Sequence, residues 1–154
     1  MSTFNKRVLI VDDDVDHRLI LKAFFLEVWC LSIEIMEANS GEEAFPLVQK
    51  WYPHLILVDL SLKQMNGQGF IQHIRMLEKA QPIEMQQADP ISPRVHIIAV
   101  STNVSKAHRL AAFTAGCDDF ICKPYAPNEM LQIVEKHIAL INRYVQPNRY
   151  LCAA

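Results

Sequence analysis

The sequence of 154 residues lacks the cysteine and hydrophobic patterns of secreted and membrane proteins. Its four cysteines form no CxxC pair and no dense framework, and 51% hydrophobic residues supply a core without disulfides. We therefore expect reduced thiols and a cytoplasmic protein. No apolar run reaches the roughly 18 residues that a membrane-spanning helix needs, and the polar N-terminus is unlike a signal peptide. We expect no membrane insertion.

An excess of charge of one sign and a glycine-rich phosphate loop are also missing. Lys and Arg number 15 and Asp and Glu 17, which gives a net charge of −2 and no basic field for direct nucleic acid binding. With only four glycines, the chain has neither GxGxxG nor a P-loop after any apolar run. A nucleotide or flavin binder is therefore a disfavoured alternative.

Short apolar runs that end abruptly in a polar residue are the main pattern that is present. Such runs are typical of parallel strands buried on both faces, and they lie at residues 8–11, 55–58, 95–100 and 120–122. Residues 33–38 alternate apolar and acidic side chains, which predicts a partly exposed edge strand.

Stretches with helical spacing separate these runs. Three of them lie at residues 15–28, 68–79 and 106–115, and two more begin at residues 40 and 127. Ser40 followed by Glu43 is a capping box that opens the second helix, and Gly116 can end the fourth in a left-handed conformation. The first helix can present one apolar face, formed by Leu19, Ile20, Ala23, Phe24 and Val28.

Strands that alternate with helices predict an α/β fold, in which right-handed crossovers build a doubly wound parallel sheet covered on both faces. We expect one domain over residues 5–143 and a C-terminal tail at 144–154. Three prolines and a polar run predict a long exposed loop at residues 80–94.

Polar side chains follow the ends of four predicted strands. Asp12 and Asp13 follow the first, Asp59 the third, Ser101 the fourth and Lys123 the fifth. Ligands of open parallel sheets bind beyond the carboxyl ends of the strands, so these side chains are expected to converge. Taken alone, the aspartates and Ser101 are more typical of a turn or helix cap, and Lys123 of a solvated surface amine.

Together, these residues indicate phosphoryl chemistry. Carboxylates brought close repel one another unless a cation lies between them, and oxygen ligands favour Mg²⁺ over zinc. A carboxylate can attack phosphorus to form an aspartyl phosphate while metal and lysine neutralise the transferred group. The predicted site moves a phosphoryl group onto an aspartate.

Four strings carry a resemblance to a known family: VLIVDDD, LILVDLSLKQMNG, IIAVST and GCDDFICKP. In this order they closely resemble the receiver domains of two-component response regulators. The resemblance implies a flavodoxin-like (βα)5 fold with five parallel strands in the order 2-1-3-4-5. The 42 residues from 59 to 101 (101 − 59 = 42) exceed the usual spacing, and the 80–94 loop accounts for the excess.

The resemblance implies a phosphoacceptor and a metal site. Asp59 corresponds to the phosphoacceptor, and Mg²⁺ would be held by Asp59, by the acidic pair Asp12 and Asp13, and by the backbone carbonyl of Ser61. Asp13 would bind the metal directly and Asp12 through water.

The resemblance also implies a switch. Ser101 matches the hydroxyl residue that reorients toward the phosphoryl group, Lys123 the amine that binds it, and Phe120 the aromatic residue whose rotamer follows. A cis peptide between Lys123 and Pro124 is implied as well. Thr102 stands where the family usually has alanine or glycine, and its branched side chain could narrow access to the phosphoacceptor.

The expected function is a phosphorelay response regulator receiver without a DNA-binding output domain. A sensor histidine kinase or a histidine phosphotransfer protein would phosphorylate it, and the surface of the fourth helix, fifth strand and fifth helix, about residues 106–143, would signal to an unknown protein. Catalysis would be limited to its own phosphorylation and dephosphorylation. A stand-alone regulator, a piece of a hybrid kinase and a homodimer all remain open.

Two alternatives use the same fold differently. A haloacid-dehalogenase-type phosphatase needs a second aspartate that the sequence Asp59-Leu60-Ser61 lacks. A receiver-like scaffold would bind partners without being phosphorylated. None of the six histidines is expected to transfer phosphate or to bind metal.

Overall fold

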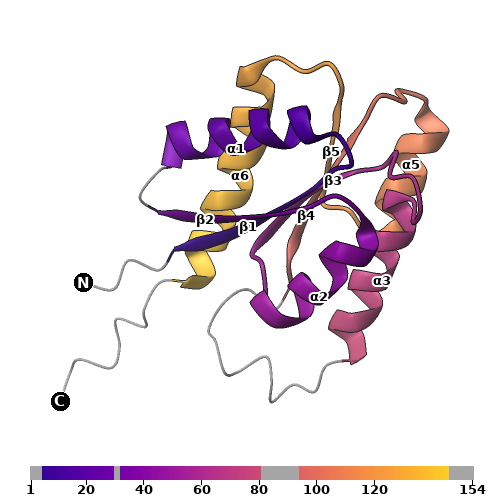
Figure 1. Cartoon of the computed structure of the whole chain (residues 1–154), viewed down its shortest axis with the longest axis horizontal. Helices are drawn as coiled ribbons and strands as arrows, with labels where there is room; N and C mark the ends of the chain where they lie inside the picture. The colour runs from indigo at the N-terminus through magenta and orange to yellow at the C-terminus, as the bar shows by residue number, and fades with distance from the viewer. Residues whose placement is uncertain (1–4, 30–31, 81–93, 146–154) are drawn as a thin grey trace.

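The computed structural model describes residues 5–29, 32–80 and 94–145, in which five parallel strands alternate with five helices (Figure 1). The strands are β1 (Lys6–Val11), β2 (Ile33–Ala38), β3 (Leu55–Asp59), β4 (His96–Ser101) and β5 (Asp119–Cys122). The helices are α1 (Val15–Trp29), α2 (Gly41–Trp51), α3 (Gly67–Ala80), α5 (Lys106–Ala115) and α6 (Pro127–Val145). Most of the expected 80–94 loop and of the tail lies outside the described residues.

The sheet has the order β2-β1-β3-β4-β5, which confirms the doubly wound fold and the edge position of β2. Successive strand residues point to opposite faces, so each buried strand feeds two cores. One core contains Leu9 and Ile56 and is covered by α2, α3 and α5, whereas the other contains Ile10 and Leu57 and is covered by α1 and α6. Figure 1 shows these two helical layers on either side of the sheet.

The predicted helix ends are confirmed where capping residues set them. The Ser40 hydroxyl accepts a hydrogen bond from the Glu43 N–H at 3.2 Å, and the Glu43 carboxylate accepts one from the Asn39 N–H at 2.7 Å. Gly116 ends α5 with φ of 117°. No helix within the described residues combines the length and apolarity needed to cross a membrane.

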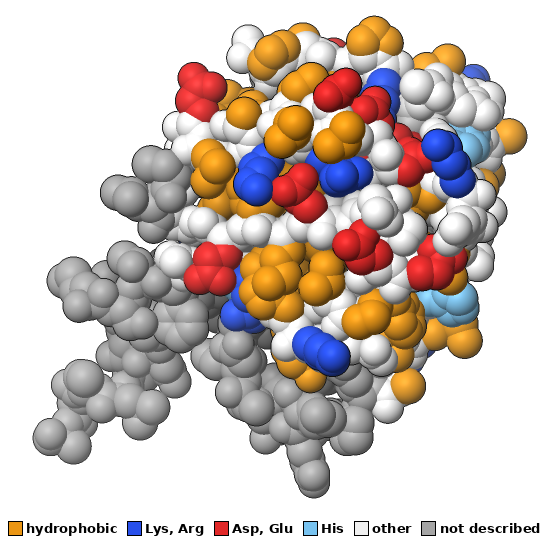
Figure 2. All heavy atoms as spheres, viewed as in Figure 1, with side chains coloured by type: hydrophobic (Ala, Val, Ile, Leu, Met, Phe, Trp, Pro, Cys, Tyr) orange, Lys and Arg blue, Asp and Glu red, His pale blue; other side chains and the backbone are white. Residues whose placement is uncertain are grey.

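The predicted apolar face of α1 is wrong as a packing face. Leu19, Ile20 and Val28 are 55%, 63% and 42% exposed, whereas Leu21 and Phe25 are buried against the sheet. Apolar side chains surround this helix, so their spacing does not determine which of them pack inward. Figure 2 shows hydrophobic side chains interspersed with charged ones on the side of the molecule that carries α1.

Candidate functional site at the strand ends

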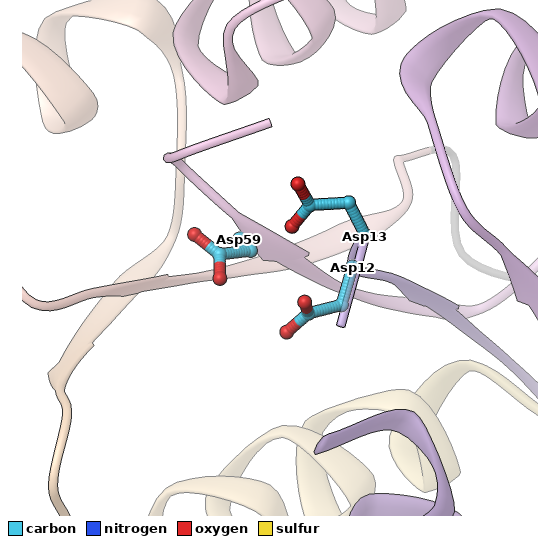
Figure 3. A group of neighbouring side chains, drawn as sticks. All are labelled: Asp12, Asp13 and Asp59. Atoms are coloured by element: carbon cyan, nitrogen blue, oxygen red, sulfur yellow. The ribbon is translucent and has the colours of Figure 1, made fainter. Parts of the chain in front are cut away.

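Three carboxylates meet where two neighbouring strands end. Asp59 is the last residue of β3, and Asp12 and Asp13 follow β1, which pairs with β3 (Figure 3). One oxygen from each side chain lies within 4.8 Å of the other two. Asp12 and Asp59 are 2% and 6% exposed, whereas Asp13 is half-buried. Two nearly buried carboxylates therefore lie beside a third that reaches solvent.

Backbone donors orient the two buried carboxylates. Asp59 Oδ1 accepts a hydrogen bond from the Ser61 N–H at 2.7 Å, and Asp12 Oδ1 accepts one from the Asp14 N–H at 2.9 Å. Each bond spans two residues and closes the turn that follows its strand. The Oδ2 atom of each carboxylate bonds instead to side chains from elsewhere in the chain.

The ammonium group of Lys123 bridges these two Oδ2 atoms. Its Nζ lies 2.6 Å from Asp59 and 3.1 Å from Asp12, and the Lys123 N–H donates to the Ser101 carbonyl at 2.8 Å. Burial on its own would lower the pKa of Lys123, but the hydrogen bond to Asp59 and the charge of Asp12 outweigh it and raise the pKa. The peptide bond between Lys123 and Pro124 is cis.

His17, in the first turn of α1, forms a second contact with Asp12. Its Nδ1 hydrogen-bonds to Asp12 Oδ2, and its Nε2 lies 2.6 Å from the hydroxyl of Tyr125. Burial raises the pKa of Asp12, but the bonds to His17 and Asp14 and the charge of Lys123 bring it below the ordinary value. Burial, with the charge of Asp12, raises the pKa of Tyr125 to about 12.

The hydroxyl of Ser101 lies at the end of β4, the strand next to β3. Ser101 is 2% exposed, and its Oγ accepts from the Asn103 N–H at 3.1 Å and lies 3.1 Å from His108 Nε2. Phe120, on β5, is 4% exposed and makes an edge contact with the His108 ring. Thr102 is exposed.

Gly67 allows the segment between β3 and α3 to pass close to the site. A Cβ atom at this position would lie 2.6 Å from both the Asp59 carbonyl oxygen and the Leu60 Cα. These are backbone atoms, which cannot rotate away as a flexible side chain can. A side chain at Gly67 would therefore disturb the backbone that carries Asp59.

The donor set fits a hard divalent cation. Asp12, Asp13 and Asp59 offer oxygen atoms from separate residues, and within the described part of the chain the ammonium bonded to the buried pair is that of Lys123. Lys63 lies 3.8 Å from Asp13, but its side chain is 85% exposed and its charge is screened. Carboxylate oxygens in excess of nearby cations are what Mg²⁺ takes as protein ligands.

Sequence reasoning missed the histidines of this site. No part in the site was predicted for the six histidines, and so the contacts of His17 with Asp12 and of His108 with Ser101 were overlooked. Both lie in the first turn of a helix that follows a strand ending at the site. Such a turn lies over the same edge of the sheet, so a histidine in it is a signal that sequence alone could have supplied.

Comparison with known proteins places these features in context. The family described as "Response regulator receiver domain" matches residues 8–135. The chemotaxis protein CheY of Thermotoga maritima is 30% identical over 132 residues, which cover 85% of this chain and 96% of that protein. A probable transcriptional regulator of Cyanophora paradoxa is 27% identical over 130 residues, or 84% of this chain and 47% of that protein. The chain thus spans about half the length of such regulators.

Solved structures share the fold. A CheY-like receiver domain from Methanospirillum hungatei JF-1 has a TM-score of 0.73 at 22% identity, covering 90% of this chain and 98% of that one. The receiver domain of a sensor histidine kinase from Pseudomonas aeruginosa PAO1 has a TM-score of 0.68 at 22% identity, covering 88% of this chain and 98% of that one. That structure is described with a magnesium ion coordinated in its active-site cleft.

Proposed function

This chain belongs to the response regulator receiver family, and we propose that it is a switch in which Asp59 accepts a phosphoryl group from a phosphohistidine. The supporting observation is the Lys123 ammonium, 2.6 Å from Asp59 Oδ2 and 3.1 Å from Asp12 Oδ2. It provides a cation beside the accepting carboxylate, where charge develops during transfer. The donor is a sensor histidine kinase or a histidine phosphotransfer protein.

The transfer is a displacement at phosphorus. A carboxylate oxygen of Asp59 bonds to phosphorus as the P–N bond to the donor histidine breaks, and the bonding electron pair leaves with the imidazole. Lys123 then pairs with a phosphoryl oxygen. Ser101 turns its hydroxyl toward another oxygen, and the exposed Thr102 borders the approach to the phosphorylated residue.

Mg²⁺ is the proposed cofactor. Asp12, Asp13, Asp59 and the backbone carbonyl of Ser61 would hold it, and the magnesium described in the Pseudomonas receiver supports the assignment. When bound, it supplies positive charge that neutralises the phosphoryl oxygens.

The chemistry is confined to the protein itself. Water attacks the aspartyl phosphate, the Asp59 oxygen leaves, and inorganic phosphate is released. Residues 5–143 form the receiver domain in this proposal, acting alone or within a longer hybrid kinase.

The output is a change in a protein-binding surface. The new charge moves Ser101 and Phe120, and the surface of α5, β5 and α6, residues 106–143, carries the change to a partner. Exposed apolar side chains at and just before α5 support this assignment: Val104, Leu110 and Phe113 are 71%, 67% and 39% exposed.

Intact-mass spectrometry after incubation with acetyl phosphate tests the proposal. We expect a gain of one phosphoryl group that requires Mg²⁺ and is lost in Asp59→Ala. Asp16→Asn, which changes an exposed carboxylate on α1, is the matched control and should be phosphorylated normally. If no mass is gained at short times and beryllofluoride does not bind with Mg²⁺, the proposal is wrong and the chain is a phosphorylation-independent scaffold.

A further inference from the structure

The hydroxyl of Ser101 is directed by two groups. It accepts a hydrogen bond from the Asn103 N–H at 3.1 Å, and His108 Nε2 lies 3.1 Å from it. In the part of the chain that the structure describes, its hydrogen bonds go to these groups and none goes to Asp59. A hydroxyl has one proton and two lone pairs, so the bond to His108 uses either the proton or the remaining lone pair.

The backbone of His108 is fixed at the start of a helix, and its ring contacts two groups of the site. It lies in the first turn of α5, where the N-cap Ser105 accepts a hydrogen bond from the His108 N–H at 3.2 Å. The ring extends back to the end of β4 and makes an edge contact with Phe120 at 6.4 Å between ring centroids. One side chain therefore contacts both proposed switch residues, the hydroxyl and the aromatic ring.

We propose that His108 is a positioning residue that holds Ser101 in its unphosphorylated orientation. This inference rests on the proposed function, in which Ser101 turns toward a phosphoryl group on Asp59. That turn breaks the bond to His108, so the bond opposes phosphorylation. Once the hydroxyl leaves, this bond no longer holds the His108 ring. Because that ring packs against Phe120, a restraint on Phe120 is removed as well.

Two substitutions separate the hydrogen bond from the packing. His108→Phe keeps a ring beside Phe120 but removes the nitrogen, whereas His108→Gln keeps a polar atom near the position of Nε2 but removes the ring. The bond predicts a change in His108→Phe and little change in His108→Gln. A role in packing alone predicts the reverse. If the phenylalanine variant does not fold, His108→Leu is compared in the wild-type and Ser101→Ala backgrounds, because an effect of lost packing persists without the Ser101 hydroxyl and an effect of the lost bond does not.

The experiment measures the affinity of beryllofluoride, in the presence of Mg²⁺, by isothermal titration calorimetry. We expect His108→Phe to bind about 2- to 10-fold more tightly than wild type, the ratio that one net hydrogen bond produces. His108→Gln should stay close to wild type. In a Ser101→Ala background, His108→Phe should have no effect, because the bond is already absent.

The outcomes that contradict the inference differ from those that contradict the proposed function. Equal affinities of wild type and His108→Phe, or the same gain in the Ser101→Ala background, would overturn the role of His108 alone. A wild type that binds no beryllofluoride with Mg²⁺ would overturn the proposed function and, with it, this inference.

Discussion

Replacing Asp13 with asparagine is expected to stabilise the protein in the absence of metal. The carboxylate oxygens of Asp12, Asp13 and Asp59 lie within 4.8 Å of one another. At 4.8 Å, two unit charges repel by about 0.9 kcal/mol in bulk water and about 3.5 kcal/mol at an effective dielectric constant of about 20. The Asp13 side chain is 25% exposed and has Lys63 at 3.8 Å, so we expect a gain near the lower figure, about 1 kcal/mol.

Magnesium should reverse this order. A ligand that binds only the folded state stabilises it by about 1.4 kcal/mol at ten times its dissociation constant. Wild type should gain this stability as Mg²⁺ is added, whereas Asp13→Asn lacks a proposed ligand and should gain less. One substitution is thus expected to raise stability in a chelator and to remove the response to the metal.

Urea unfolding in EDTA and in Mg²⁺ measures both effects. Asp16→Asn is the control, because this exposed carboxylate lies in the first turn of α1. Its loss should destabilise the protein by about 0.3–1 kcal/mol through the helix dipole, without changing the response to Mg²⁺. The reasoning is refuted if Asp13→Asn is less stable than wild type in EDTA, or if Mg²⁺ stabilises this variant as much as it stabilises wild type.

Three further predictions concern other parts of the chain. Burial, with the charges of Arg7 and Lys6, lowers the pKa of His54 to about 4 from 6.5, so the unfolded state takes up a proton in this window before the folded state does. Stability should therefore fall by up to about 3 kcal/mol as the pH drops from about 6.5 to 4. His54→Asn, which keeps an acceptor for the Arg7 N–H, should flatten this slope in urea unfolding at several pH values. If stability depends on pH in His54→Asn as it does in wild type, groups other than His54 cause the loss of stability at acid pH. Gly67→Ala should destabilise the fold and slow phosphorylation, because its Cβ meets backbone atoms at 2.6 Å; wild-type thermal stability would contradict this. Thr102→Ala should gain or lose its phosphoryl group faster than wild type in a mass-spectrometric time course, and equal rates would remove a role for the branched side chain.

The parallel sheet and the place of the acidic cluster could be predicted because both follow from patterns along the chain, whereas the order of the strands came from the family resemblance. Buried strands of a parallel sheet appear as continuous apolar runs, and the polar residue that ends each run lies at the carboxyl edge. Asp12, Asp13 and Asp59 come together for this reason. Lys123 joins them because β5 ends at the same edge two strands away from β3.

The orientation of α1 could not be predicted from the same kind of pattern. Leu19 and Ile20 belong to one apolar face of this helix, and Leu21 and Phe25 to another. Both faces satisfy helical spacing, so packing decides between them. Phe25 is the fully buried member, with Phe24 and Trp29 in edge or tilted ring contact with it. Each face carries a phenylalanine, Phe24 on the predicted face and Phe25 on the buried one, so ring size does not decide between them and the fit against the sheet does.

The histidine contacts mark a different limit: the sequence could have placed His17 and His108 near the edge of the sheet, but not the atoms that their rings contact. His17 and Tyr125 are 108 residues apart, and their contact exists only because α1 and the segment after β5 both cross the edge of the sheet. His108 is seven residues from Ser101, but Ser101 ends a strand and His108 lies on the following helix, so no single period relates the two side chains. The turn between β4 and α5 brings the two together, and Ser105 sets where that helix begins. An N-cap thus positions a histidine over the end of the preceding strand. A change at Ser105 should therefore alter the proposed switch without touching Ser101 itself.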